Sequence, residues 1–75
     1  MMYRNIWFSQ SEPDLIDQIE ESPTKVIKYL LENYDNVEET HDQPWGDSDD
    51  TYRWKNYVLA WNSHLDYVSL TEILE

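Results

Sequence analysis

The stretch from Asp35 to Thr51, DNVEETHDQPWGDSDDT, is the part of the sequence that most restricts how this chain can fold. It contains seven carboxylates and neither Lys nor Arg. Carboxylates without partners are too costly to bury, so this stretch has to stay at the surface. Pro44 and Gly46 predict a turn within it. We therefore expect an acidic loop at about residues 35–51 and a core built from the segments on either side.

The composition points in two directions. The formal net charge of −11 and the mean hydropathy of −0.81 are typical of disordered chains. The aromatic content of 15% is not, because large rings stabilise a chain by packing in a core. A chain of 75 residues is long enough for one domain with a modest core. We therefore expect a single ordered domain over residues 1–75.

The chain contains no Cys, so neither a disulfide framework nor a Cys-based zinc site can stabilise it. Oligomerisation is the other common source of stability for a small chain, and a homodimer is one expectation. No apolar run approaches the ~20 residues that cross a bilayer. The first ten residues, MMYRNIWFSQ, lack the apolar segment of a signal peptide. We expect a cytoplasmic protein that does not bind membranes.

Two helices are expected between residues 11 and 34. The first follows SEPDLIDQIEES, with Ser11 as a candidate N-cap and Pro13 in the first turn. The second runs from about Pro23 to Tyr34, with Ser22 as its cap, because apolar residues recur there at helical spacing. These residues are Val26, Ile27, Leu30, Leu31 and Tyr34. The alternative is a single helix that bends at Pro23.

Segments rich in aromatic and β-branched residues predict three strands. Met2–Ser9 is the first, although Tyr3 does not alternate cleanly with the later apolar residues. The second is TYRWKNYVLAWNS, whose rings change parity near Lys55-Asn56. This change indicates either a bulge or a strand that is covered on both faces. The third, YVSLTEIL, follows the turn NSHLD and pairs with the end of the second segment in an antiparallel hairpin.

These elements predict an α+β fold, with a three-stranded, mostly antiparallel sheet and one or two helices packed on one face. Rings of both parities in the second strand segment also suggest that the other face of the sheet is not fully solvated. A partner subunit would cover that face. Partial exposure of Tyr and Trp is the simpler alternative.

The sequence shows no catalytic or metal-binding pattern. There is no Cys nucleophile and no Gly-rich phosphate loop, and neither His41 nor His64 belongs to a Ser–His–Asp arrangement that we can place. DQPWGDSDD offers oxygen ligands but lacks the spacing of a calcium loop and its final Glu. A solvated acidic turn explains that stretch more simply. We therefore expect no enzyme activity, no cofactor and no metal.

The distribution of charge is the more specific signal. Between Glu12 and Asp50 there are thirteen acids and only two bases, Lys25 and Lys28. Acids at helical spacing in the first helix would form a stripe with about 5–6 Å between neighbours. One DNA strand carries a phosphate every ~3.4 Å of helix axis, with two strands interleaved. A stripe and an acidic loop can therefore present carboxylates at separations comparable to those of phosphates.

Self-repulsion makes such a surface costly for folding, which calls for a functional explanation, although solubility is an alternative. If the surface binds a partner, that partner is a basic protein whose Lys and Arg normally contact phosphates. Trp45 would add an apolar or cation–π anchor, unless it folds back onto the domain. The candidate partner-binding residues are Asp14, Asp17, Glu20, Glu21, Glu32, Asp35, Glu38, Glu39, Asp42, Trp45, Asp47, Asp49 and Asp50.

In size, acidity, lack of Cys and aromatic content, the chain resembles the small DNA-mimic proteins that phages use to disable host DNA-binding proteins. Among these it is most similar to acidic phage inhibitors of the bacterial nucleoid protein HU. The segments that carry the resemblance are EPDLIDQIEES and DNVEETHDQPWGDSDD. DNA mimics share a surface rather than a sequence motif. The resemblance implies a dimeric protein whose acids occupy the DNA-binding face of a partner and which does not itself bind nucleic acid.

Other functions fit the same sequence. An anti-restriction or anti-CRISPR inhibitor would use the same physics against another target. An immunity protein against a basic nuclease toxin would use a rigid acidic patch and bind tightly in a one-to-one complex. An acidic assembly adaptor would bind through the aromatic face of the sheet, with little dependence on salt.

Overall fold

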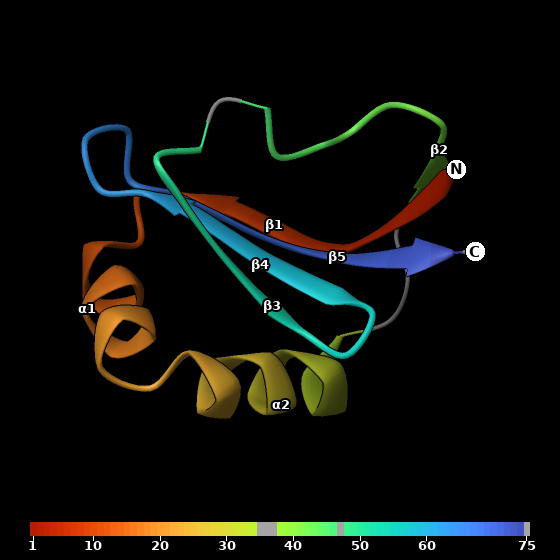
Figure 1. Cartoon of the computed structure of the whole chain (residues 1–75). Coiled ribbons are helices and arrows are strands. Elements are labelled where there is room, and N and C mark those ends of the chain that lie inside the picture. Colours follow the sequence, from red (N-terminus) through yellow and green to blue (C-terminus); the bar gives the residue numbers. More distant parts are fainter. Residues whose placement is uncertain (35–37, 47, 75) are drawn as a thin grey trace.

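In a computed structural model of the chain, two helices pack on one face of a five-stranded antiparallel sheet, over the described residues 1–34, 38–46 and 48–74 (Figure 1). The strand order is β2-β1-β5-β4-β3. The elements are β1 (Met2–Gln10), α1 (Pro13–Glu21), α2 (Pro23–Asn33), β2 (Glu38–Thr40), β3 (Asp50–Trp54), β4 (Tyr57–Asn62) and β5 (Tyr67–Leu74). The expected α+β class and the hairpin of β4 with β5 are confirmed. The expected number of three strands is wrong.

One additional strand arises because the segment after Thr51 is a hairpin and not one strand. Trp54 pairs with Tyr57, and Lys55 and Asn56 form the turn between β3 and β4. Lys55 has φ 56, a left-handed conformation that is uncommon for a residue with a side chain. The change of parity that we attributed to a bulge or to two covered faces is therefore a reversal of the chain.

The other additional strand lies within the expected acidic loop. β2 pairs with Tyr3–Asn5 at the edge of the sheet. The guanidinium of Arg4 bridges two carboxylates, with Nη2 2.9 Å from Oε1 of Glu39 and Nη1 3.3 Å from Oε1 of Glu72. This cation compensates for the charge that β2 brings to the sheet.

The two helices follow the predicted pattern, with one correction at the start of α1. The N-cap of α1 is Glu12, and Ser11 instead occupies a turn with φ 64, where its N–H donates to the carbonyl of Asp66 at 2.7 Å. Ser22 separates the two helices with φ −148 and ψ 76. Because Pro23 disfavours a helical conformation in the residue before it, the chain forms two helices rather than one bent helix.

The core lies between the helices and the sheet. Ile19 and Ile27 from the helices and Leu59, Val68 and Leu70 from the strands are fully buried there. A register shift between Asn5 and Trp7 in β1 explains the irregular alternation of the first strand.

The second face of the sheet is covered by the chain itself. Figure 1 shows the segment between β2 and β3 crossing the face opposite the helices. The ring of Trp45 packs edge-on against Tyr3 with centroids 5.0 Å apart, and the hydroxyl of Tyr67 donates to the carbonyl of Pro44 at 3.0 Å. Ala60 and Ser69, which pair across β4 and β5, are both buried. The expected cover of this face therefore comes from the chain's own loop.

Candidate partner-binding surface

The four acids of α1 point away from the core. The helix buries Ile16 and Ile19, so residues at the other positions of the helical turn face solvent. Within the described residues, none of these carboxylates forms an ion pair. They are Asp14, Asp17, Glu20 and Glu21, and all four are exposed.

Glu20 and Glu21 are also badly placed for the helix itself. They lie in the last turn of α1, which contains no basic residue. The C-terminal end of a helix carries the negative pole of its dipole, where carboxylates are unfavourable. Helix stability therefore does not explain why these two positions are acidic.

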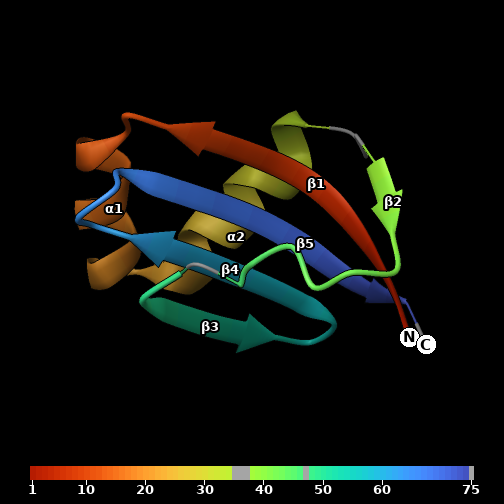
Figure 2. The same cartoon turned by 90° about the horizontal axis from the view of Figure 1, so that it is seen from above.

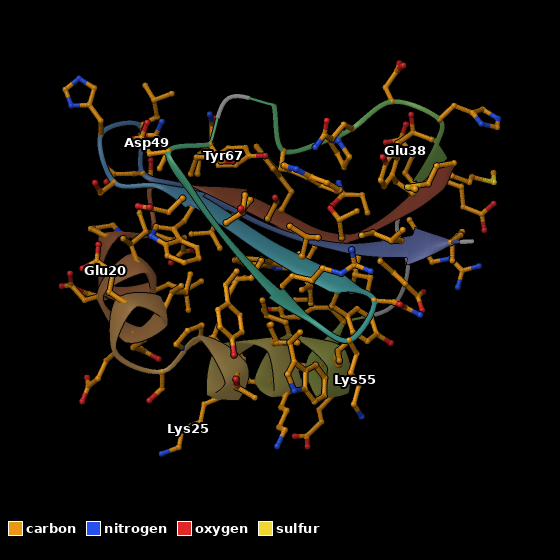
Figure 3. The ribbon with its side chains drawn as sticks, in the orientation of Figure 1. Glu20, Lys25, Glu38, Asp49, Lys55 and Tyr67 are labelled. Carbon is orange, nitrogen blue, oxygen red and sulfur yellow. The ribbon has the colours of Figure 1, made fainter. Side chains whose placement is uncertain are left out.

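The start of β3 adds two exposed acids to the same end of the sheet. Figures 1 and 2 both show α1 and the start of β3 at this end, and Figure 3 shows Glu20 and Asp49 there. Asp49 and Asp50 are exposed and form no ion pair with a described residue. We call these six residues the acidic end: Asp14, Asp17, Glu20, Glu21, Asp49 and Asp50.

The other predicted residues that the structure describes are not part of the acidic end. Figure 3 places Glu38 far from Glu20, at the opposite end of the sheet, where Glu39 is paired with Arg4. Glu32 is exposed on α2, and Asp42 is exposed beyond β2. Asp35 and Asp47 lie outside the described residues. The eleven candidates that the structure describes therefore do not form one continuous surface.

Trp45 does not extend from the loop as a free anchor. It is half-buried and packs against Tyr3. The turn that holds it is stabilised by Ser48, whose hydroxyl donates to the carbonyl of Trp45 at 2.7 Å. Of the two roles considered for this ring, the structure shows folding back onto the domain.

A hollow of about 250 Å³ was not foreseen from the sequence. It lies between β1, α1 and the end of α2, and we call it the Trp7 groove. Asp14 belongs both to this groove and to the acidic end. The described lining is Trp7, Glu12, Asp14, Leu15, Gln18, Tyr29, Leu30 and Tyr34. A tyrosine off the apolar stripe of α2, at residue 29, was the only hint of it in the sequence.

The phenol of Tyr57 has a raised pKa. Burial is the main cause that raises the pKa of its phenol, and the neighbouring Glu72 carboxylate raises it further. Arg4 opposes this effect. The group lies on the sheet away from the acidic end, so it bears on stability rather than on partner binding.

The described residues include no cluster of three or more potential metal ligands, and both His41 and His64 are exposed. None of the described helices has the length and apolar character needed to span a membrane. No family model matches the chain, and comparisons with curated proteins and with solved structures gave no significant match. Function is therefore inferred from the chain's own residues.

Proposed function

We propose that this protein is a DNA-mimic inhibitor that occupies the DNA-binding surface of a basic host protein, such as the nucleoid-associated protein HU, through its acidic end. The observation that carries the proposal is that six exposed carboxylates, on α1 and at the start of β3, lie at one end of the sheet and form no ion pair among the described residues. Because no cation among the described residues pairs with these six carboxylates, they are free to interact with solvent or with a partner.

Two physical arguments support a role in binding. Carboxylates on successive turns of α1 lie about 5–6 Å apart, close to the spacing at which a basic protein meets phosphates. Glu20 and Glu21 also oppose the dipole of α1, so they reduce the stability of the helix that presents them. Because acids at these two positions destabilise the helix, binding to a partner explains them better than folding does.

Among the alternatives, an adaptor that binds through the aromatic sheet face receives less support. That face already carries the segment around Trp45, held by Tyr3 and by Tyr67. A partner would have to displace these contacts. Anti-restriction inhibitors and immunity proteins would use the same acidic end and differ only in the target.

The test is the affinity for purified HU at several salt concentrations, compared between two variants that lose the same charge. Asp17→Asn/Glu20→Gln/Glu21→Gln removes acids from the acidic end. Glu32→Gln/Glu38→Gln/Asp42→Asn removes exposed acids elsewhere. We expect the first triple variant to bind about tenfold more weakly or worse, with a salt slope reduced by roughly one per acid.

The control triple variant should bind nearly as well as the original protein. Duplex DNA should displace the original protein from HU, because both ligands would occupy one surface. Binding that resists salt and ignores DNA would overturn the proposal, as would an equal loss in the two triple variants.

A further inference from the structure

The Trp7 groove combines exposed rings with an apolar floor. Tyr29 is 55% exposed and Tyr34 is 42% exposed, so part of each ring is open to solvent. The ring centroids of Trp7 and Tyr34 are 5.6 Å apart with an interplanar angle of 44°. The buried Leu30 and the partly buried Leu15 form the apolar part of the lining.

The charge of the groove selects the kind of ligand. Glu12 and Asp14 contribute two carboxylates, and the described lining contains neither Lys nor Arg. Neither Tyr29 nor Tyr34 has a cation of the described chain over its ring. Rings and carboxylates around one hollow favour a cation, since the ring face attracts positive charge and the carboxylate pairs with it.

Contacts between cations and an aromatic ring are present elsewhere in this chain, at Trp54. The ammonium of Lys55 lies 4.5 Å from the ring centroid of Trp54, and that of Lys28 lies 5.7 Å from it. Trp54 therefore has cations from its own chain, whereas the tyrosines of the groove do not.

We infer that the Trp7 groove receives an arginine side chain of the basic partner, between its tyrosine rings and the carboxylates of Glu12 and Asp14. A planar guanidinium can stack on a ring and also pair with a carboxylate, which an ammonium cannot do as well. A second copy of this chain is a poorer occupant of this groove than a basic partner, because a chain of net charge −11 has few cations to offer to Glu12 and Asp14. The inference rests on the proposed function, since it names the group by which the basic partner is recognised.

The first experiment tests the groove without any partner protein. The probe is the peptide acetyl-Gly-Arg-Gly-amide, followed by two-dimensional NMR of the whole chain. We expect shifts at the indole N–H of Trp7 and at Tyr29 and Tyr34. The analogue with citrulline, which has the same shape without the charge, should produce much smaller shifts.

Variants of the exposed tyrosines test the same site in the complex. Tyr29→Ala and Tyr34→Ala should each weaken binding of the peptide and of HU about two- to fivefold, the size of an exposed cation–π contact. Phe8→Ala is the matched control, because Phe8 is a 48% exposed ring outside the groove. Unlike loss of acids, loss of a ring should leave the salt slope for HU nearly unchanged, because no ionic contact is removed.

The outcomes separate this inference from the proposed function. If HU binds through the acidic end but the tyrosine variants behave like Phe8→Ala, the inference is wrong and the proposed function stands. If HU does not bind while the arginine peptide still shifts the groove residues, the proposed function fails with HU as the partner. Choline chloride is a further probe. If choline binds more tightly than the arginine peptide, the inference of an arginine ligand is wrong and the groove prefers a quaternary ammonium group.

Discussion

Two aromatic regions of this protein differ in the charged groups that surround their rings. At the β3–β4 turn, Trp54 is stacked with Tyr57 at 6.2 Å and has Lys55 and Lys28 over its ring. In the Trp7 groove, exposed tyrosines lie beside carboxylates, and the described lining contributes no cation. The chain therefore places Lys28 and Lys55 at Trp54 and no cation in the described lining of the groove, where we propose that a partner supplies one.

The carboxylates show the same division. Glu39 on β2 and Glu72 on β5 share Arg4, at the end of the sheet opposite the acidic end. The acids of α1 have no such partner among the described residues. The net charge of −11 is therefore only partly compensated by ion pairs within the described residues, and six of the unpaired carboxylates lie at the end that we propose to bind.

Reversing charge at the acidic end should have the largest effect on binding and an opposite effect on stability. In Glu20→Lys/Glu21→Lys, two cations would replace two acids in the last turn of α1. Affinity for HU should fall about tenfold or more for each reversal at low salt. The free energy of unfolding should rise by about 0.3–1 kcal/mol per residue, because cations suit the C-terminal end of a helix. Calorimetric titration and urea denaturation measure the two quantities.

If this variant loses stability as well as affinity, the acids stabilise the fold. The contrast between the paired carboxylates at Arg4 and the unpaired acids of α1 would then be wrong. Glu32→Lys on α2 is a control for the change in net charge. Its affinity for HU should change much less, because Glu32 is not part of the acidic end.

Removing the shared cation should have the next largest effect. Arg4→Met keeps the aliphatic part of the side chain and leaves Glu39 and Glu72 without their partner. We expect a loss of about 1–2 kcal/mol in the free energy of unfolding, since the pairs are only partly shielded from water. The measurement is urea denaturation, repeated with Arg53→Met, a cation outside these pairs. An equal loss in both variants would show that total charge matters more than the position of Arg4.

A smaller effect is expected at Trp54. Lys55→Gln removes the closer of the two cations over this ring and should cost about 0.5–1 kcal/mol of stability. Lys25→Gln is the control, because Lys25 lies on α2 away from any ring contact among the described residues. No difference between the two variants would mean that Trp54 does not depend on the cation, which would weaken the contrast with the Trp7 groove.

The sequence predicted those elements whose formation depends on residues close together in the chain. The apolar spacing from Val26 to Leu30, with Pro23 at the start, is enough to define α2. The hairpin of β4 and β5 follows from two β-rich segments around a polar turn. The turn at Lys55 was missed because it contains no Gly, and a left-handed Lys is not expected there.

Contacts distant in sequence explain the other errors. β2 has two acids in three residues, and its pairing depends on Arg4, far earlier in the chain. Exposure of the α1 acids was predictable from Ile16 and Ile19 on the opposite face. The gathering of these acids with Asp49 and Asp50 was not, because it depends on where β3 begins in the sheet. The Trp7 groove combines residues of three elements and has no local pattern.

The smallest predicted effect concerns the pH dependence of stability at Tyr57, which pairs with Glu72 across β4 and β5. Burial and then the Glu72 carboxylate raise the pKa of Tyr57 above its ordinary value of 10.0. The folded state therefore holds this proton more tightly than the unfolded chain does. Stability that is fully present below pH 10 is lost as the pH rises through the raised pKa. Tyr57→Phe should remove this loss, so its melting temperature should fall less steeply above pH 10.

Arg4 pairs with Glu72 and also influences the titration of Tyr57. Because Arg4 lowers the pKa of Tyr57 while the other influences raise it, Arg4→Met should move the pKa still higher. Ultraviolet titration of the phenol, with Tyr57→Phe as the reference, measures the change directly. A lower pKa in Arg4→Met would mean that Glu72 moves away from Tyr57 once its cation is lost. The carboxylate would then behave like those of the acidic end, and its position beside β4 would depend on Arg4 alone.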